Sequence, residues 1–134
     1  IDKDKKRLKF IKAAIKSYPN LDITLLETIS SLEDTIDGIN ILLYGDPSLS
    51  SRDIEQKESI ASKVGIIIWN MWRSRSNPTK TNEKLYQIAS SDFEKLITKI
   101  QNLDNSIKEL ENYLEKNEVP FTPGRGLILN WKKE

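Results

Sequence analysis

Residues 81–115 read TNEKLYQIASSDFEKLITKIQNLDNSIKELENYLE. Apolar or small side chains recur in this stretch at alternating spacings of three and four residues: Tyr86, Ala89, Phe93, Leu96, Ile100, Leu103, Ile107, Leu110 and Leu114. This spacing places one apolar stripe along one side of an α-helix. The stretch therefore predicts a long helix that partner helices cover along that stripe, with a kink near Ser90 because Ser91-x-x-Glu94 resembles a capping box.

Three earlier segments carry the same spacing. Their stripes are Leu8, Ile11, Ile15 and Tyr18 in residues 4–18; Leu25, Ile29, Leu32, Ile36, Ile39 and Leu43 in residues 22–44; and Ile60, Val64, Ile67 and Met71 in a helix from Ser50 or Ser51 to Arg73. Pro19-Asn20 and Gly45-Asp46-Pro47 separate the first three segments, since proline and glycine end helices. We expect an all-α fold, an antiparallel up-down four-helix bundle over residues 1–118 with a non-helical tail at 119–134.

Composition excludes much enzyme chemistry. The chain has no cysteine and no histidine, so it lacks thiol nucleophiles, thiolate metal sites and the commonest general base. The acidic residues of the predicted helices fall off the apolar stripes, as expected of a solvated face. We therefore expect no catalytic residue, no cofactor and no metal site, and the chain is interpreted as a non-enzyme.

Charge is unevenly distributed behind a net charge of +1. Residues 1–20 hold seven Lys or Arg and two Asp, whereas residues 21–60 hold two basic and nine acidic residues. A basic first helix beside an acidic second one explains this pattern. The alternative, a patch for nucleic acid or anionic lipid, lacks interleaved aromatic residues, so we expect no nucleic-acid partner. The longest apolar run, Val64 to Trp69, is too short to span a bilayer, so no membrane insertion is expected.

The third predicted helix has more apolar residues than its stripe needs. Ile66, Ile68, Trp69 and Trp72 lie off the stripe, so this helix is either the most buried one or an interface. With Arg73, the two tryptophans have two interpretations: an aromatic shelf for sugar or peptide, or burial in the core or against a neighbouring domain.

The tail is rich in both turn residues and apolar residues. Pro120, Pro123, Gly124 and Gly126 prevent a continuous helix, while Phe121 and Trp131 are unusual in a free terminus: they stand in PFTPGRGLILNW, residues 120–131. We expect this segment to dock on the bundle or on a neighbouring domain. Arg125 either offers its guanidinium donors to a carboxylate or carbonyl, or is a solvated turn residue.

Three stretches together resemble a known family. They are Tyr44–Ser50 running into Glu58–Gly65, then Asn77–Thr81, then Val119–Arg125. In this order they resemble the C-terminal helical region of large extracytoplasmic bacterial β-propeller proteins, the BNR-repeat or sortilin-like proteins often labelled glycosyl hydrolases. The resemblance implies a periplasmic or extracellular location, a propeller as partner, and any hydrolase chemistry on propeller residues outside this chain.

Two functional hypotheses follow. The first is a non-catalytic accessory domain that packs against the propeller, with Trp69, Trp72, Arg73, Phe121, Arg125 and Trp131 as contact residues. The second is a ligand-binding or sensor module with a site between helices. The chain starts at Ile1 with a charged segment, and we expect a fragment whose targeting signals lie upstream.

Overall fold

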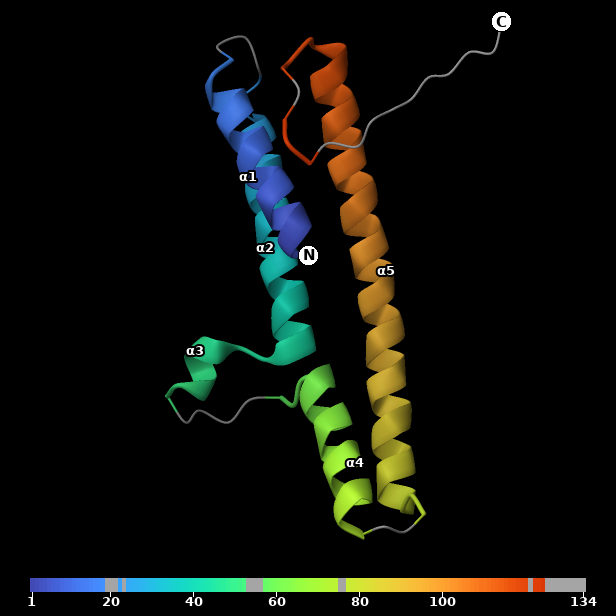
Figure 1. Ribbon diagram of the computed structural model, residues 1–134. Coiled ribbons are helices and arrows are strands. Elements are labelled where there is room, and N and C mark those ends of the chain that lie inside the picture. Colours follow the sequence, from blue (N-terminus) through green and yellow to red (C-terminus); the bar gives the residue numbers. More distant parts are fainter. Residues whose placement is uncertain (19–21, 23, 53–56, 75–76, 121, 125–134) are drawn as a thin grey trace, which may run out of the picture. The chain divides into compact units, whose positions relative to one another are not determined.

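The computed structural model describes residues 1–18, 22, 24–52, 57–74, 77–120 and 122–124. Its helices are α1 (Asp2–Lys16), α2 (Thr24–Tyr44), α3 (Pro47–Ser50), α4 (Ile60–Ser74) and α5 (Lys80–Lys116) (Figure 1). The described residues contain no strand, which confirms the predicted all-α class.

The chain divides into two compact units. Unit 1 comprises Ile1–Asp34 and Asp104–Glu134, and unit 2 comprises Thr35–Leu103. Helices α2 and α5 each contribute one part to unit 1 and another part to unit 2.

The predicted ends of the second helix agree with the local chemistry. Asp22 Oδ1 accepts a hydrogen bond from the Thr24 amide at 3.0 Å, which satisfies a donor that the first turn of α2 leaves unpaired. At the other end, Gly45 has φ of 90° and its amide donates to the Ile41 carbonyl at 2.8 Å. Glycine adopts this left-handed conformation without the steric cost that a Cβ would impose, and α2 therefore ends at Tyr44.

The predicted start of the third helix, at Ser50 or Ser51, is wrong. Asp46 Oδ1 accepts from the Ser48 amide at 2.8 Å, and Pro47 opens the short helix α3 instead. Helix α4 begins only at Ile60, where Ser59 Oγ accepts from the Ser62 amide at 3.1 Å. Asp46 thus caps the short helix α3 and Ser59 caps α4, so no helix begins at Ser50 or Ser51. Asp53 of the proposed capping box lies outside the described residues.

Helix α5 passes through the proposed kink without interruption. Ser90, Ser91 and Glu94 all lie within its 37 residues, about 55 Å of continuous helix. The capping-box pattern here marks no helix start, because a partnered apolar stripe continues on both sides of it.

Unit 1 contains α1, the first part of α2 and the last part of α5. Its buried apolar residues come from all three helices and the following segment: Leu8, Ile11, Ile15, Ile29, Leu32, Ile107, Leu110, Leu114 and Val119. The stripes predicted for these segments therefore form a common core. Lys12 Nζ of α1 donates to Glu33 Oε2 of α2 at 2.6 Å on the edge of this core.

Within unit 1, α1 and the end of α5 run in the same direction (Figure 1). Arg7, early in α1, pairs with Glu111, and Tyr18, after the end of α1, donates its hydroxyl to the Glu118 carbonyl at 3.3 Å. A strictly alternating up-down bundle would make its first and fourth long helices antiparallel. The alternation expected from sequence does not hold for this pair.

The described part of the tail lies on unit 1. The Val119 amide donates to the Leu114 carbonyl at 3.0 Å, and Val119 and Thr122 are both buried. Gly124 has φ of +89°, and a Cβ added there would lie 2.7 Å from Arg7 Cγ of α1. The tail therefore passes against the aliphatic stem of Arg7. The predicted contacts of Phe121, Arg125 and Trp131 lie outside the described residues.

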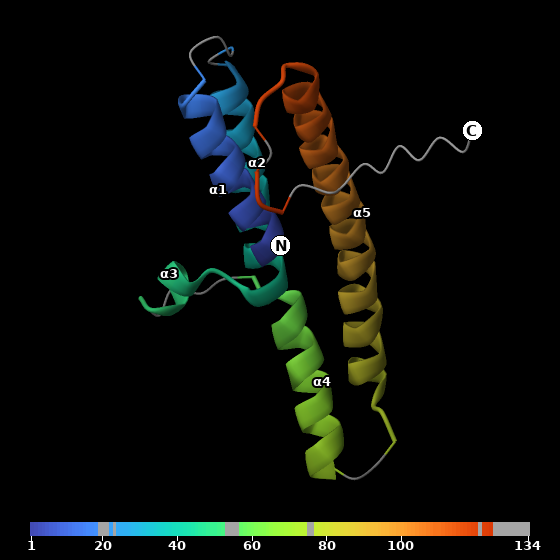
Figure 2. The ribbon, with the colours of Figure 1, turned by 45° about the horizontal axis from the view of Figure 1, so that its top comes forward.

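Unit 2 contains the second part of α2, α3, α4 and the first part of α5. Figures 1 and 2 both show α4 alongside the start of α5. Lys63 pairs with Asp92 and Asn70 with Asn82, so residue numbers rise along α4 as they fall along α5. The two helices form an antiparallel hairpin, whose buried apolar residues join those of α2: Ile36, Ile39, Ile60, Ala89, Leu96 and Leu103.

Several stripe residues of unit 2 are exposed, contrary to the expected burial of the full stripe. Tyr86 is 64% exposed and Phe93 47%. Val64 and Met71 of α4 are also exposed. The pairing of α4 with α5 therefore leaves parts of both stripes uncovered among the described residues of this unit.

Candidate functional site

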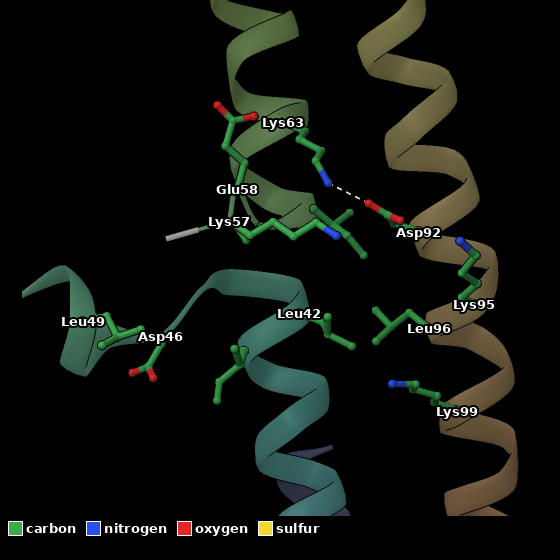
Figure 3. Close-up of a pocket in the computed structure, with 13 residues that line it drawn as sticks. Leu42, Asp46, Leu49, Lys57, Glu58, Lys63, Asp92, Lys95, Leu96 and Lys99 are labelled. Carbon is green, nitrogen blue, oxygen red and sulfur yellow. Dashed lines mark hydrogen bonds and ion pairs between the residues drawn. The ribbon is translucent and has the colours of Figure 1, made fainter. Parts of the chain in front are cut away.

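The first site candidate is a cavity of about 450 Å³ in unit 2 (Figure 3). It lies between the end of α2, the α3 region, the start of α4 and the middle of α5. Its apolar lining consists of Ile41, Leu42, Leu49, Ile60 and Leu96. Its charged lining consists of Lys57, Lys63, Lys95 and Lys99 with Asp46, Glu58 and Asp92. The volume falls within the range of about 300–1,000 Å³ that small-molecule sites occupy.

One ion pair lies in the lining of this cavity and joins α4 to α5. Lys63 Nζ donates to Asp92 Oδ2 at 2.6 Å, and the Lys63 side chain is only 7% exposed (Figure 3). The hydrogen bond from Lys63, with the nearby charges of Lys63, Lys57 and Lys95, holds the pKa of Asp92 below its ordinary value. A buried ammonium needs such a partner, so this pair has a structural role.

The Asp92 pair predicts a pH-dependent contribution to stability. Because the folded pKa of Asp92 is depressed, the pair stabilises fully above the unfolded value of about 3.9 and is lost as pH falls through the folded pKa. Asp92→Asn should therefore lower the urea midpoint at pH of about 6, and the deficit should shrink toward pH of about 2. Glu94→Gln, at an exposed carboxylate two residues later, is the matched control. A deficit of equal size at both pH values would contradict the assignment.

The other three lysines of the cavity are exposed. Among the residues that the structure describes, no carboxylate forms an ion pair with Lys57, Lys95 or Lys99. Lys95 and Lys99 are one turn apart on α5, and like charges at this spacing repel each other. In Figure 3, Leu42 and Leu96 point toward each other and the ammonium of Lys99 lies beside them. The cavity thus combines an apolar floor with cations that have spare hydrogen-bonding capacity.

The second candidate is the outer face of α4. Trp72 is 72% exposed, Ile68 62% and Trp69 54%. The Trp69 and Trp72 rings lie 5.8 Å apart at an interplanar angle of 38°, and Arg73 Cζ lies 5.9 Å from the Trp69 ring centroid. The structure therefore brings together three predicted contact residues, Trp69, Trp72 and Arg73, and places them on the surface. The other three predicted contact residues, Phe121, Arg125 and Trp131, lie outside the described residues.

An uncharged groove adjoins this face. It measures about 550 Å³ and is lined by α4 and α5, with Leu43 of α2 at one end. Val64 and Ile68 stand on its α4 side, and Tyr86 and Phe93 on its α5 side. Gly65 lies between them, so a partner backbone can approach α4 closely there. We use the name α4 face for this groove and the exposed surface beside it. Its residues are Val64, Gly65, Ile68, Tyr86, Phe93, Trp69, Trp72 and Arg73.

Sequence reasoning singled out Ile68, Trp69, Trp72 and Arg73 of the α4 face, but it placed Val64, Tyr86 and Phe93 on covered stripes and missed the cavity. One signal was present: Lys63 lies between Ile60 and Ile67, on the packed side of α4, where a lysine requires an acidic partner. That signal points to Asp92 only once the pairing of α4 with α5 is known.

Other site types find no support in the described part of the chain. It contains no group of three or more acidic side chains placed to hold a metal ion. None of its helices combines the length and apolar character that a membrane crossing requires. Comparisons with protein-family models, with curated proteins and with solved structures gave no match for this chain. The resemblance to β-propeller proteins therefore rests on the three sequence stretches alone.

Proposed function

We propose that this chain is a non-catalytic accessory domain of a larger extracytoplasmic protein and packs against a β-propeller of that protein through the α4 face. The observation that carries the proposal is the exposure of Ile68, Trp69 and Trp72 on one helix. The propeller as partner, and the periplasmic or extracellular location, come from the resemblance described above.

The chemistry of the α4 face favours a protein partner. Tryptophan, tyrosine, methionine and arginine are enriched in interfaces, and large exposed apolar patches are uncommon on soluble monomers. Val64, Ile68 and Trp72 lie four residues apart, so they form one ridge along α4. The absence of cysteine and histidine supports the non-catalytic part of the proposal.

For the whole chain we propose a four-helix bundle of α1, α2, α4 and α5, built from the consecutive pairs α1–α2 and α4–α5. The shared three-and-four spacing of the four stripes supports it. Such a bundle should unfold in one transition. Far-ultraviolet circular dichroism and tryptophan fluorescence should therefore give the same urea midpoint, and separate midpoints would contradict a single bundle.

Substitution on the α4 face should disrupt docking. The propeller part of the parent protein would be titrated into this domain while tryptophan emission is followed, because burial of Trp69 and Trp72 shifts emission to shorter wavelength. Ile68→Glu places a charge in the centre of the face and should weaken binding at least about ten-fold. Ser91→Glu, an exposed position of α5 outside the face, is the matched control and should bind like the wild type.

Two results would overturn the docking proposal. One is undiminished affinity of Ile68→Glu for the propeller. The other is a wild-type domain that dimerises in analytical ultracentrifugation while Ile68→Glu is monomeric, because the α4 face would then be an interface between two copies of this chain.

A ligand-binding or sensor module is the second candidate function. The cavity of unit 2 favours it, since it has a volume of about 450 Å³ and both apolar and charged lining. Ile60 lines both the cavity and the groove, but Val64, Ile68, Trp69, Trp72, Tyr86 and Phe93 do not line the cavity. A ligand in the cavity and a partner on the α4 face can therefore bind at the same time.

A further inference from the structure

The cavity of unit 2 separates its apolar and cationic groups. Its apolar lining contains two exposed side chains, Ile41 (44%) and Leu42 (45%, Figure 3), beside Ile60 and Leu96, which are buried. A ligand with an alkyl or aromatic part would cover Ile41 and Leu42 and remove their apolar surface from water.

The charged groups of the cavity differ in what they still offer. Lys63 and Asp92 neutralise each other at 2.6 Å, and Asp46 Oδ1 already accepts from the amide and hydroxyl of Ser48. Lys95 and Lys99 remain as neighbouring cations on α5, without an ion pair in the described part of the chain. A bound anion would relieve their mutual repulsion, whereas a bound cation would add to it.

We propose that this cavity binds a small amphipathic carboxylate, with its carboxylate on Lys95 and Lys99 and its alkyl chain against Ile41, Leu42 and Leu49. This inference names the ligand class for the second candidate function, on which it rests. Carboxylates form charge-assisted hydrogen bonds with ammonium groups, and an alkyl chain needs no polar partner. Bare phosphate lacks the apolar part that this floor would cover.

The experiment compares ligands that differ in one property at a time. Hexanoate, octanoate, octanol and octylamine would each be titrated into the full chain by calorimetry, below micelle-forming concentrations. Octanoate should bind more tightly than hexanoate, by about four-fold for each methylene that is fully buried. Octanoate should also bind at least about ten-fold more tightly than octylamine, because a lysine ammonium attracts the carboxylate and repels the ammonium of octylamine.

Variants test the two halves of the site separately. Lys95→Gln with Lys99→Gln should weaken octanoate about ten-fold, while Lys84→Gln, an exposed lysine of α5 outside the cavity, should have no effect. Leu42→Ser should reduce the difference between octanoate and hexanoate, since it removes part of the floor. All substituted side chains are exposed, so the fold should be retained, and Trp72→Ala should leave octanoate affinity unchanged.

The outcomes distinguish the ligand class from the binding function. Equal affinity for octanoate, octanol and octylamine would overturn the carboxylate but leave an apolar ligand site. If the variant with both Lys95→Gln and Lys99→Gln binds octanoate as tightly as the wild type, the carboxylate is likewise overturned and an apolar ligand site is left. Absence of binding for all four compounds at millimolar concentration would overturn both the carboxylate and the ligand-binding function.

Discussion

Replacing Leu96 by alanine should lower the free energy of unfolding by about 2 to 5 kcal/mol. Leu96 lies in the middle of α5 and is only 1% exposed in the core of unit 2. The substitution removes buried methyl groups and enlarges a space that the neighbouring helices cannot close without moving, since α5 is anchored over 37 residues. Urea denaturation followed by circular dichroism at 222 nm measures the loss as a lower midpoint at unchanged slope.

Phe93→Ala is the matched control for Leu96→Ala. Phe93 precedes Leu96 by three residues on the same helix and belongs to the same sequence stripe, but 47% of it is exposed. Although phenylalanine is the larger side chain, its replacement should cost less than about 1 kcal/mol, because partly exposed residues lose less burial. A loss for Phe93 as large as that for Leu96, or a loss below about 0.5 kcal/mol for Leu96, would contradict the packing of unit 2.

The contrast between these two residues shows how far periodicity predicts the fold. Spacing alone places Phe93 and Leu96 on one stripe, and the existence of α1, α2, α4 and α5 follows from such stripes. Burial also depends on which partner helices lie over each flank of the stripe. In unit 2, Ala89 and Leu96 are buried, whereas Tyr86 and Phe93 stand exposed along the groove.

Local capping chemistry limited the prediction of helix boundaries. Both Ser50-x-x-Asp53 and Ser91-x-x-Glu94 satisfy the same pattern, yet α4 begins ten residues after the first and α5 passes through the second. Ser59 and Asp46 provide the caps that the structure uses, at positions where a helix start also suits the apolar spacing. A cap is worth only about 1 kcal/mol, so tertiary packing decides between competing caps.

The two site candidates differed in predictability for a related reason. The α4 part of the face, with Ile68, Trp69, Trp72 and Arg73, was recognised because these residues are close together on one helix, where an excess of apolar side chains is visible in sequence. The cavity combines Leu42, Lys63 and Leu96 from three segments, so only their pairing in space creates it. The net charge of the chain did not point to the cavity either, because the charges of Lys63 and Asp92 cancel each other.

Removing Glu111 from unit 1 should cost about 2 to 4 kcal/mol of stability. Arg7 Nε and Nη2 donate to Glu111 Oε1 at 3.1 and 2.9 Å, and Nη2 also donates to Oε2 at 2.9 Å. The Arg7 and Glu111 side chains are only 15% and 9% exposed. Glu111→Ala therefore leaves a mostly buried guanidinium whose remaining carboxylate partners are Asp4, at 3.1 Å, and the more exposed Asp104, at 3.9 Å.

A double-mutant cycle separates the ion pair from the packing around it. Arg7→Met and Glu111→Met would be measured singly and together, with the free energy of unfolding taken from urea denaturation. The double variant should lose less than the sum of the single variants, since neither Arg7 nor Glu111 is then left buried without the other. Methionine keeps an unbranched stem beside Gly124, whose Cα approaches the Arg7 stem so closely that a Cβ would lie 2.7 Å from Arg7 Cγ.

The more exposed pair of Lys12 and Glu33, also in unit 1, is the control for this cycle. Its ammonium and carboxylate are 2.6 Å apart, but the side chains are 32% and 27% exposed, so its coupling should be only about 0.2 to 1 kcal/mol. The Arg7–Glu111 coupling should exceed this value several-fold, because water screens its charges less. Equal coupling in the two cycles would mean that the bidentate geometry and the burial of the Arg7–Glu111 pair add nothing beyond a more exposed ion pair.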